Sequence, residues 1–198
     1  MSVFAQTTKF KGVCAKNEFS VIWTVSKDKN GDTQLKIDSG GTKITTQKFA
    51  ADWSTLEWKI SDSVNKVYGQ ASIKNGVITI TGTVNGKKVS RKETLKHPWY
   101  QNIQYSAPHV IPMKEGSGVT YSLVNVRDLK IYDMQATFKK TYRCGNHFTR
   151  HLFITPDGIF AKFWKANYYI DTSTKMFVRY NSVEGRPGTP ETVWTICE

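Results

Sequence analysis

The fold is decided by residues 66–105, which read KVYGQASIKNGVITITGTVNGKKVSRKETLKHPWYQNIQY. Two pairs, Asn75-Gly76 and Asn85-Gly86, separate runs in which apolar and polar residues alternate. Such pairs favour the type I′ turn of a β-hairpin, because both residues tolerate a positive φ. The alternation ends where Pro98, Trp99 and Tyr100 follow one another. We therefore expect an antiparallel meander whose apolar face is covered by the Pro-Trp-Tyr segment.

Turn signals recur about every 8–12 residues along the rest of the chain, a spacing typical of all-β sandwiches and barrels. The sequence predicts one domain over residues 1–198, a curved antiparallel sheet or incomplete barrel of about ten strands. A short helix is expected near residues 98–107, after Pro98. Between Tyr132 and Tyr142 the alternating apolar row is interrupted at Lys140, which indicates a strand end or a pore mouth.

The composition indicates a well-packed, basic chain. Aromatic residues make up 13% of the 198 residues, too many for a disordered chain. The net charge of +12 attracts anionic partners, although the same lysines could simply solvate a face and protect strand edges. Because the lysines are dispersed, no specific nucleic-acid partner is expected. No apolar run approaches the roughly 20 residues needed to cross a bilayer.

The chain has three cysteines, Cys14, Cys144 and Cys197. Cys14 and Cys197 lie in the first and last strand-like segments, so they could form a disulfide if the sheet closes on itself. The start Val3-Phe4-Ala5 fits a signal-peptidase site whose charged and apolar parts are missing. We therefore expect a periplasmic or secreted protein.

Metal and catalytic motifs are weak. Cys144, His147 and His151 have a suggestive spacing, but on a strand the two histidines would lie about 13 Å apart. No nucleophile elbow or glycine-rich phosphate loop is present. The sequence thus predicts no metal and no cofactor, and it favours a non-catalytic role.

Large aromatic residues are the most informative feature of the second half. They suit a packed barrel core and equally a cavity for an elongated apolar ligand, with Arg179 or Lys162 at its mouth to pair an anionic head group. Both interpretations stay open. The predicted ligand-binding residues are Trp99, Tyr100, Tyr105, Phe163, Trp164, Tyr168, Arg179 and Tyr180.

The segments Phe163–Tyr169, Met176–Tyr180 and Gly185–Thr192, together with His97–Gln101, resemble uncharacterised exported bacterial proteins with a lipocalin-like or LolA-like β-rich fold. The resemblance covers roughly residues 60–195. It implies an incomplete antiparallel barrel and an envelope location, and it assigns no catalytic residue.

The expected function is non-catalytic binding of a hydrophobic or amphipathic, anionic ligand in the bacterial envelope. Two alternatives remain. One is a lipocalin-like enzyme that uses a His or Tyr in the cavity as acid or base. The other is a module whose basic surface binds an anionic polymer or makes peripheral contact with an anionic membrane. The sequence leaves the oligomeric state open.

Overall fold

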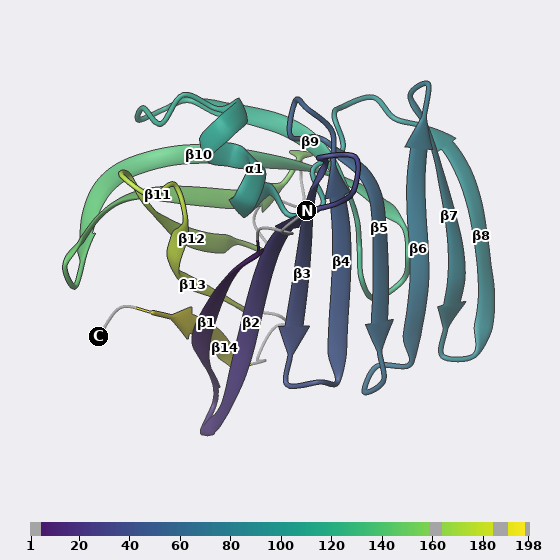
Figure 1. Ribbon diagram of the computed structural model, residues 1–198, viewed down its shortest axis with the longest axis horizontal. Helices are drawn as coiled ribbons and strands as arrows, with labels where there is room; N and C mark the ends of the chain where they lie inside the picture. Colours follow the sequence, from purple (N-terminus) through teal and green to yellow (C-terminus); the bar gives the residue numbers. More distant parts are fainter. Residues whose placement is uncertain (1–4, 159–163, 184–189, 197–198) are drawn as a thin grey trace. The chain divides into compact units, whose positions relative to one another are not determined.

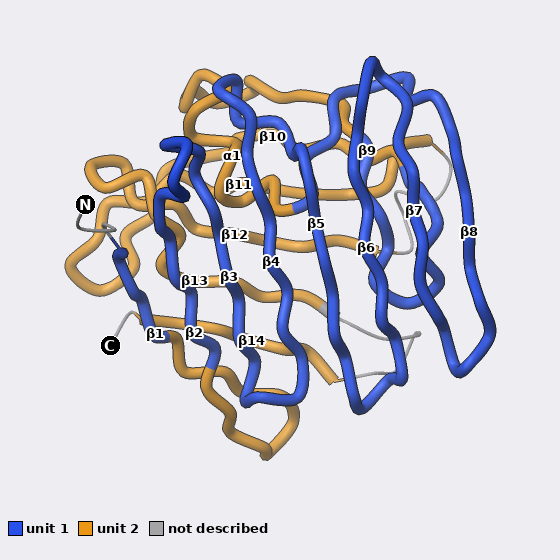
Figure 2. The backbone as a smooth tube through the Cα atoms, turned by 45° about the vertical axis from the view of Figure 1, so that its right-hand side comes forward, with its two compact units in different colours: residues 1–9, 21–101, 122–132 blue, residues 10–20, 102–121, 133–198 orange. Residues whose placement is uncertain are grey.

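A computed structural model describes residues 5–158, 164–183 and 190–196 of the chain. These residues form two compact units that interleave along the sequence (Figure 2). Unit 1 contains residues 1–9, 21–101 and 122–132, and unit 2 contains residues 10–20, 102–121 and 133–198. The single domain expected from the sequence stays a prediction.

Unit 1 is built from a meander of neighbouring hairpins (Figure 1). Its strands follow the order β8-β7-β6-β5-β4-β3-β2, and each neighbouring pair is antiparallel. The strands are β2 (Asn17–Lys27) from residue 21 on, β3 (Thr33–Ser39), β4 (Lys43–Phe49), β5 (Thr55–Asp62), β6 (Val67–Lys74), β7 (Val77–Val84) and β8 (Lys87–Thr94). Part of β9 (Gly118–Val124) also belongs to this unit.

Unit 2 contains a second antiparallel run, in the order β1-β14-β13-β12-β11-β10. Its elements are residues 10–14 of β1 (Ala5–Cys14), the helix α1 (Ile103–Val110), β10 (Ile131–Cys144) from residue 133 on, β11 (His147–Pro156), β12 (Ala166–Asp171), β13 (Phe177–Val183) and β14 (Glu191–Thr195). Strands β8 and β9 end the strand order, so the sheet is open. The predicted class, an all-β antiparallel sheet with one short helix, is confirmed for the described residues, with fourteen strands instead of about ten.

The two Asn-Gly turns of unit 1 are confirmed. Asn75 and Gly76 have φ values of 51° and 75°, and Asn85 and Gly86 have values of 50° and 77°. Both residues of each turn therefore occupy the left-handed region that a type I′ turn requires. This turn chemistry fixes the register of β6, β7 and β8 and with it the face on which each side chain lies.

Trp99 covers the apolar face of the unit 1 meander, as expected. It is 1% exposed and packs in a core cluster with Trp58 and Ile80. Its indole Nε1 donates to Gln101 Oε1 at 2.9 Å, and Gln101 Nε2 donates to the Val124 carbonyl at 2.7 Å. The buried indole therefore keeps a hydrogen-bond partner, which is the condition for burying a Trp without a penalty.

The helix begins later than expected. Trp99 forms a bridge with Ser122 of β9, a turn follows at residues 101–102, and α1 starts only at Ile103. Pro108 lies inside the last turn of the helix. Pro108 has no N–H for the Gln104 carbonyl, but the Ile111 amide still donates to the Ala107 carbonyl at 2.9 Å.

A β-bulge explains the interrupted row near Lys140. The register of β10 with β11 shifts between Phe138 and Thr141. Before the bulge, Met134, Ala136 and Phe138 are buried, as the alternation predicted. After it, residues 139–143 are all exposed, including Tyr142.

The disulfide between Cys14 and Cys197 that the sequence left open does not form, because Cys14 is a free thiol. Cys144 at the end of β10 is the disulfide-bonded cysteine, and Cys197 lies outside the described residues. A sequence places strands in order but does not say which neighbours meet, so the odd cysteine could not be identified from it. Among the described residues, no helix has the length and apolarity to cross a membrane.

Candidate functional site: a groove across strands β4 to β7

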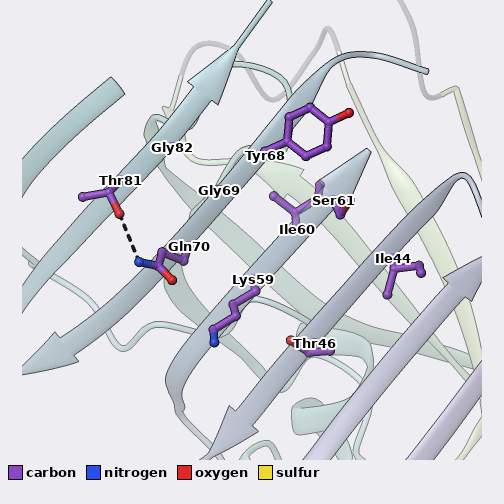
Figure 3. A pocket seen from close by; sticks show the side chains of 10 residues that line it. All are labelled: Ile44, Thr46, Lys59, Ile60, Ser61, Tyr68, Gly69, Gln70, Thr81 and Gly82. Atoms are coloured by element: carbon purple, nitrogen blue, oxygen red, sulfur yellow. Dashed lines mark hydrogen bonds between the residues drawn. The ribbon is translucent and has the colours of Figure 1, made fainter. Parts of the chain in front are cut away.

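An open groove of about 460 Å³ crosses the sheet of unit 1 (Figure 3). We call it the β4–β7 groove. It is lined by Ile44, Thr46, Lys59, Ile60, Ser61, Tyr68, Gly69, Gln70, Thr81 and Gly82. Its volume lies within the range of small-molecule sites in proteins.

The strand register arranges the side chains of the groove in two rows, which Figure 3 shows on adjacent strands. The first row is Ile44, Ser61 and Tyr68, which are direct cross-strand partners. The second row contains the cross-strand partners Thr46, Lys59, Gln70 and Thr81. Directly opposed residues lie on the same face of a sheet, so each row presents its side chains together.

The two rows differ in chemistry. Ile44 is half-buried and Tyr68 is 47% exposed, so the first row offers apolar and aromatic surface. The second row carries Lys59, the one charged group in the lining, and Gln70, whose Nε2 lies 3.4 Å from Thr81 Oγ1. Within the described ranges Lys59 has no ion pair. Its ammonium is therefore available to an anion.

The floor of the groove is set by a close backbone approach. Gly69 and Gly82 are cross-strand partners, and both lie against the buried side chain of Leu129. A Cβ atom at Gly82 would clash with the Tyr68 carbonyl oxygen and would lie 2.7 Å from Gly69 Cα. Only glycine fits at position 82. The packing of Gly82 and Leu129 therefore fixes the backbone of Tyr68 and the floor of the groove.

Two residues predicted to bind ligand, Trp99 and Tyr100, lie in the interior of unit 1 and do not line the groove. Burial raises the pKa of Tyr100, and the Asp52 carboxylate raises it further. Tyr105 lies on α1 in unit 2, where burial raises its pKa. These phenols are therefore neutral at physiological pH.

Tyr168 and Tyr180 come together in an aromatic cluster of unit 2. Their ring centroids are 4.6 Å apart, and Tyr180 lies 4.8 Å from Trp194. Tyr168 also meets the edge of Phe177, which stacks on Phe10. Trp164 is half-buried, whereas the predicted Phe163 and Lys162 lie outside the described residues. The ligand-binding role of this set stays a prediction.

Arg179 lies on the opposite face of the sheet from Tyr180, because successive strand residues alternate. There its guanidinium carbon is 5.9 Å from the Tyr169 ring, which stacks on His151 with 5.2 Å between centroids. His151 Nε2 contacts Asn167 Oδ1 at 2.8 Å. Burial lowers the pKa of His151, and nearby Lys139 lowers it further, against the raising effect of Asn167.

His147 Nδ1 lies 2.7 Å from Asp171 Oδ2, the kind of pair that acid–base catalysis also uses. The other oxygen, Asp171 Oδ1, accepts hydrogen bonds from Ser173 and Thr174 in the turn after β12. The pair lies outside the β4–β7 groove. We assign it to the turn. Among the described residues, no group of three or more His, Cys, Asp or Glu could hold a metal ion.

Sequence reasoning missed the groove, because its residues lie on strands predicted to have a merely solvated face. The available signal was the register implied by the Asn-Gly turns. It places Tyr68 and Gln70 on the same face of β6, with Thr81 opposite Gln70.

No family model matches the chain, and no curated protein matches it. One solved structure is similar: a beta-barrel-like protein of the domain of unknown function DUF1849 from Brucella abortus. It has 7% sequence identity and a TM-score of 0.64, over 98% of this chain and 94% of that chain. At this identity the similarity shows a shared beta-barrel-like fold.

Proposed function

We propose that this chain is a non-catalytic binding protein that takes an amphipathic, anionic ligand in the β4–β7 groove. The observation that carries the proposal is the pairing of an apolar row, Ile44 and Tyr68, with the unpaired cation Lys59 in one open groove. An apolar tail could lie along the first row while its anionic head pairs with the Lys59 ammonium.

The groove lining favours binding over catalysis. Its one charged residue is Lys59, and the lining places no histidine or carboxylate beside Lys59 or Tyr68 to form the paired groups that acid–base catalysis uses. The proposal includes a periplasmic or secreted location. The disulfide at Cys144 supports that location, because disulfides persist in oxidising compartments.

The experiment is a titration of the ¹⁵N-labelled protein with dodecyl phosphate below its micelle concentration, followed by NMR. We expect shift changes at residues 44–46, 59–61, 68–70 and 81–82. Lys59→Glu should weaken binding roughly fivefold or more, since an exposed ion pair contributes up to about 1 kcal/mol and the new carboxylate repels the phosphate. Tyr68→Ala should also weaken it through lost apolar contact.

The matched control is Lys29→Glu, an exposed lysine in the turn between β2 and β3 of the same unit that does not line the groove. It changes the net charge equally and should leave the affinity within about twofold. An equal loss of affinity in Lys59→Glu and in the control would show that net charge alone attracts the ligand. Shift changes at Trp99, Tyr168 and Tyr180 instead would move the site to the interior aromatic residues.

A further inference from the structure

The β10–β11 hairpin of unit 2 ends in a cationic and aromatic tip. We define the hairpin tip as residues 139–150, whose turn lies at the left edge of Figure 1. Phe148 is 63% exposed and Tyr142 is 47% exposed. Both are among the few large hydrophobic residues that the described part of the chain leaves exposed.

The charged residues of the segment that carries these rings are all basic. From Gln135 to Thr155 the sequence contains no Asp or Glu, and its basic residues are Lys139, Lys140, Arg143 and Arg150. The side chains of Lys139, Lys140 and Arg143 are exposed and have no ion pair with any described residue. An anionic surface would therefore meet no carboxylate along this segment.

The cations at the tip are held against aromatic rings. The Arg143 guanidinium carbon lies 5.7 Å from the centre of the Phe148 ring, its cross-strand partner. Lys139 Nζ lies 5.7 Å from the centre of the Phe153 ring. The Phe148 side chain has no polar group. Arg143 Nε donates to the Gly145 carbonyl at 3.2 Å, which leaves the terminal N–H groups of the guanidinium for an anion.

We propose that the hairpin tip docks the protein on the surface of an anionic bilayer. Phe148 enters the headgroup region, and the cations around it pair with lipid phosphates. Peripheral proteins bind in this way, through apolar area and attraction to anionic lipid together. A soluble polyanion would pair with the cations but would gain no binding energy from contact with the exposed Phe148. The site is separate from the β4–β7 groove, since its residues belong to unit 2.

The experiment is co-sedimentation of the full chain with vesicles of phosphatidylcholine containing about one-third phosphatidylglycerol. We expect binding to these vesicles, little binding to pure phosphatidylcholine, and weakening when NaCl rises from about 0.05 to 0.2 M. Phe148→Ser should weaken binding roughly tenfold through lost apolar burial. Lys140→Glu should weaken it roughly fivefold or more.

Two matched controls test the location. Val64→Ser removes a 70% exposed apolar side chain from the turn between β5 and β6. Lys92→Glu changes the net charge as Lys140→Glu does, on the exposed β8 of unit 1. Both variants should bind the anionic vesicles with an affinity within about twofold of that of wild type. In addition, the tryptophan fluorescence of Phe148→Trp should shift to shorter wavelength when anionic vesicles are added. The fluorescence of Val64→Trp should not shift.

Three results would overturn the proposal. Wild-type protein could fail to bind the anionic vesicles. Lys92→Glu could weaken binding as much as Lys140→Glu, which would show attraction by net charge. Phe148→Ser could bind vesicles and soluble polyphosphate as well as wild type does, which would indicate a polyanion site. Circular dichroism checks that each variant is folded. Phe148→Ser should bind dodecyl phosphate as tightly as wild type, so a failure of the membrane proposal can be told apart from a failure of the groove proposal.

Discussion

Asp171 is the residue on which the β12–β13 turn depends. Its side chain is buried and accepts hydrogen bonds from the Ser173 hydroxyl at 2.6 Å, the Thr174 amide at 2.8 Å and His147 at 2.7 Å. Burial raises the pKa of Asp171, but the hydrogen bonds from Ser173, Thr174 and His147 together hold it well below its usual range. The ionised carboxylate is therefore the form that the fold stabilises.

This gives a prediction for Asp171→Asn. At pH 7 the variant should be less stable by about 1.5–3 kcal/mol, because charge-assisted hydrogen bonds are lost. An unfolded Asp has a pKa of about 3.9, and the folded pKa is lower, so the stabilisation is present above pH about 4 and is lost as the pH falls below it. The difference in free energy of unfolding between wild type and Asp171→Asn should therefore be smaller at pH 3 than at pH 7.

Urea unfolding at pH 7 and pH 3 measures this difference. Asp157→Asn, at an exposed turn carboxylate, is the control and should change stability by less than about 0.5 kcal/mol at either pH. A stability difference for Asp171→Asn that is the same at both pH values would contradict the prediction.

The cysteines give a second prediction at this scale. Cys14 is free and Cys144 is disulfide-bonded, and the chain has three cysteines. We expect alkylation of unreduced, denatured protein to label one thiol, and peptide mapping to locate it at Cys14. Reduction before alkylation should raise the count to three. A label on Cys144 without reduction would contradict this assignment.

Among the elements, β6 and β7 place two glycines, Gly69 and Gly82, opposite each other. An added Cβ at Gly69 meets the ends of the Leu129 side chain at 2.9 and 3.0 Å, and these can shift. At Gly82 it meets backbone atoms of Tyr68 and Gly69, which cannot shift without disturbing the ladder. A methyl group at Gly69 therefore displaces a side chain, whereas a methyl group at Gly82 displaces backbone.

We expect Gly82→Ala to destabilise the protein by about 2–3 kcal/mol and Gly69→Ala by about 1 kcal/mol or less. Chemical unfolding of both variants tests the difference. A Leu129→Ala background should relieve the cost of Gly69→Ala but not that of Gly82→Ala, because only the first clash is with the Leu129 side chain alone. Equal costs for the two alanines in both backgrounds would contradict this account.

The elements also show what the sequence could predict. The Asn75-Gly76 and Asn85-Gly86 turns were predictable because a two-residue turn depends on local φ preferences. The start of α1 was not, because the bridge from Trp99 to Ser122 joins segments that are distant in the chain. The groove depends in the same way on the register of four strands, and a residue such as Lys59 looks like any solvated lysine until its neighbours are known.

At the scale of the whole molecule, the net charge of +12 could attract any anion, so it must be separated from the two proposed sites. The β4–β7 groove belongs to unit 1 and the hairpin tip to unit 2. Lys59→Glu and Lys140→Glu lower the net charge equally. Long-range attraction therefore changes equally in both variants, while the local contacts differ.

We accordingly expect each substitution to act on one ligand. Lys59→Glu should weaken dodecyl phosphate binding and leave vesicle binding within about twofold, and Lys140→Glu should do the reverse. In the double variant, the two losses of binding free energy should add within about 0.5 kcal/mol, as for independent sites. Titration and co-sedimentation of the three variants at one salt concentration measure this. If either single variant weakened both ligands equally, the charge of the whole molecule and not the two local sites would govern binding.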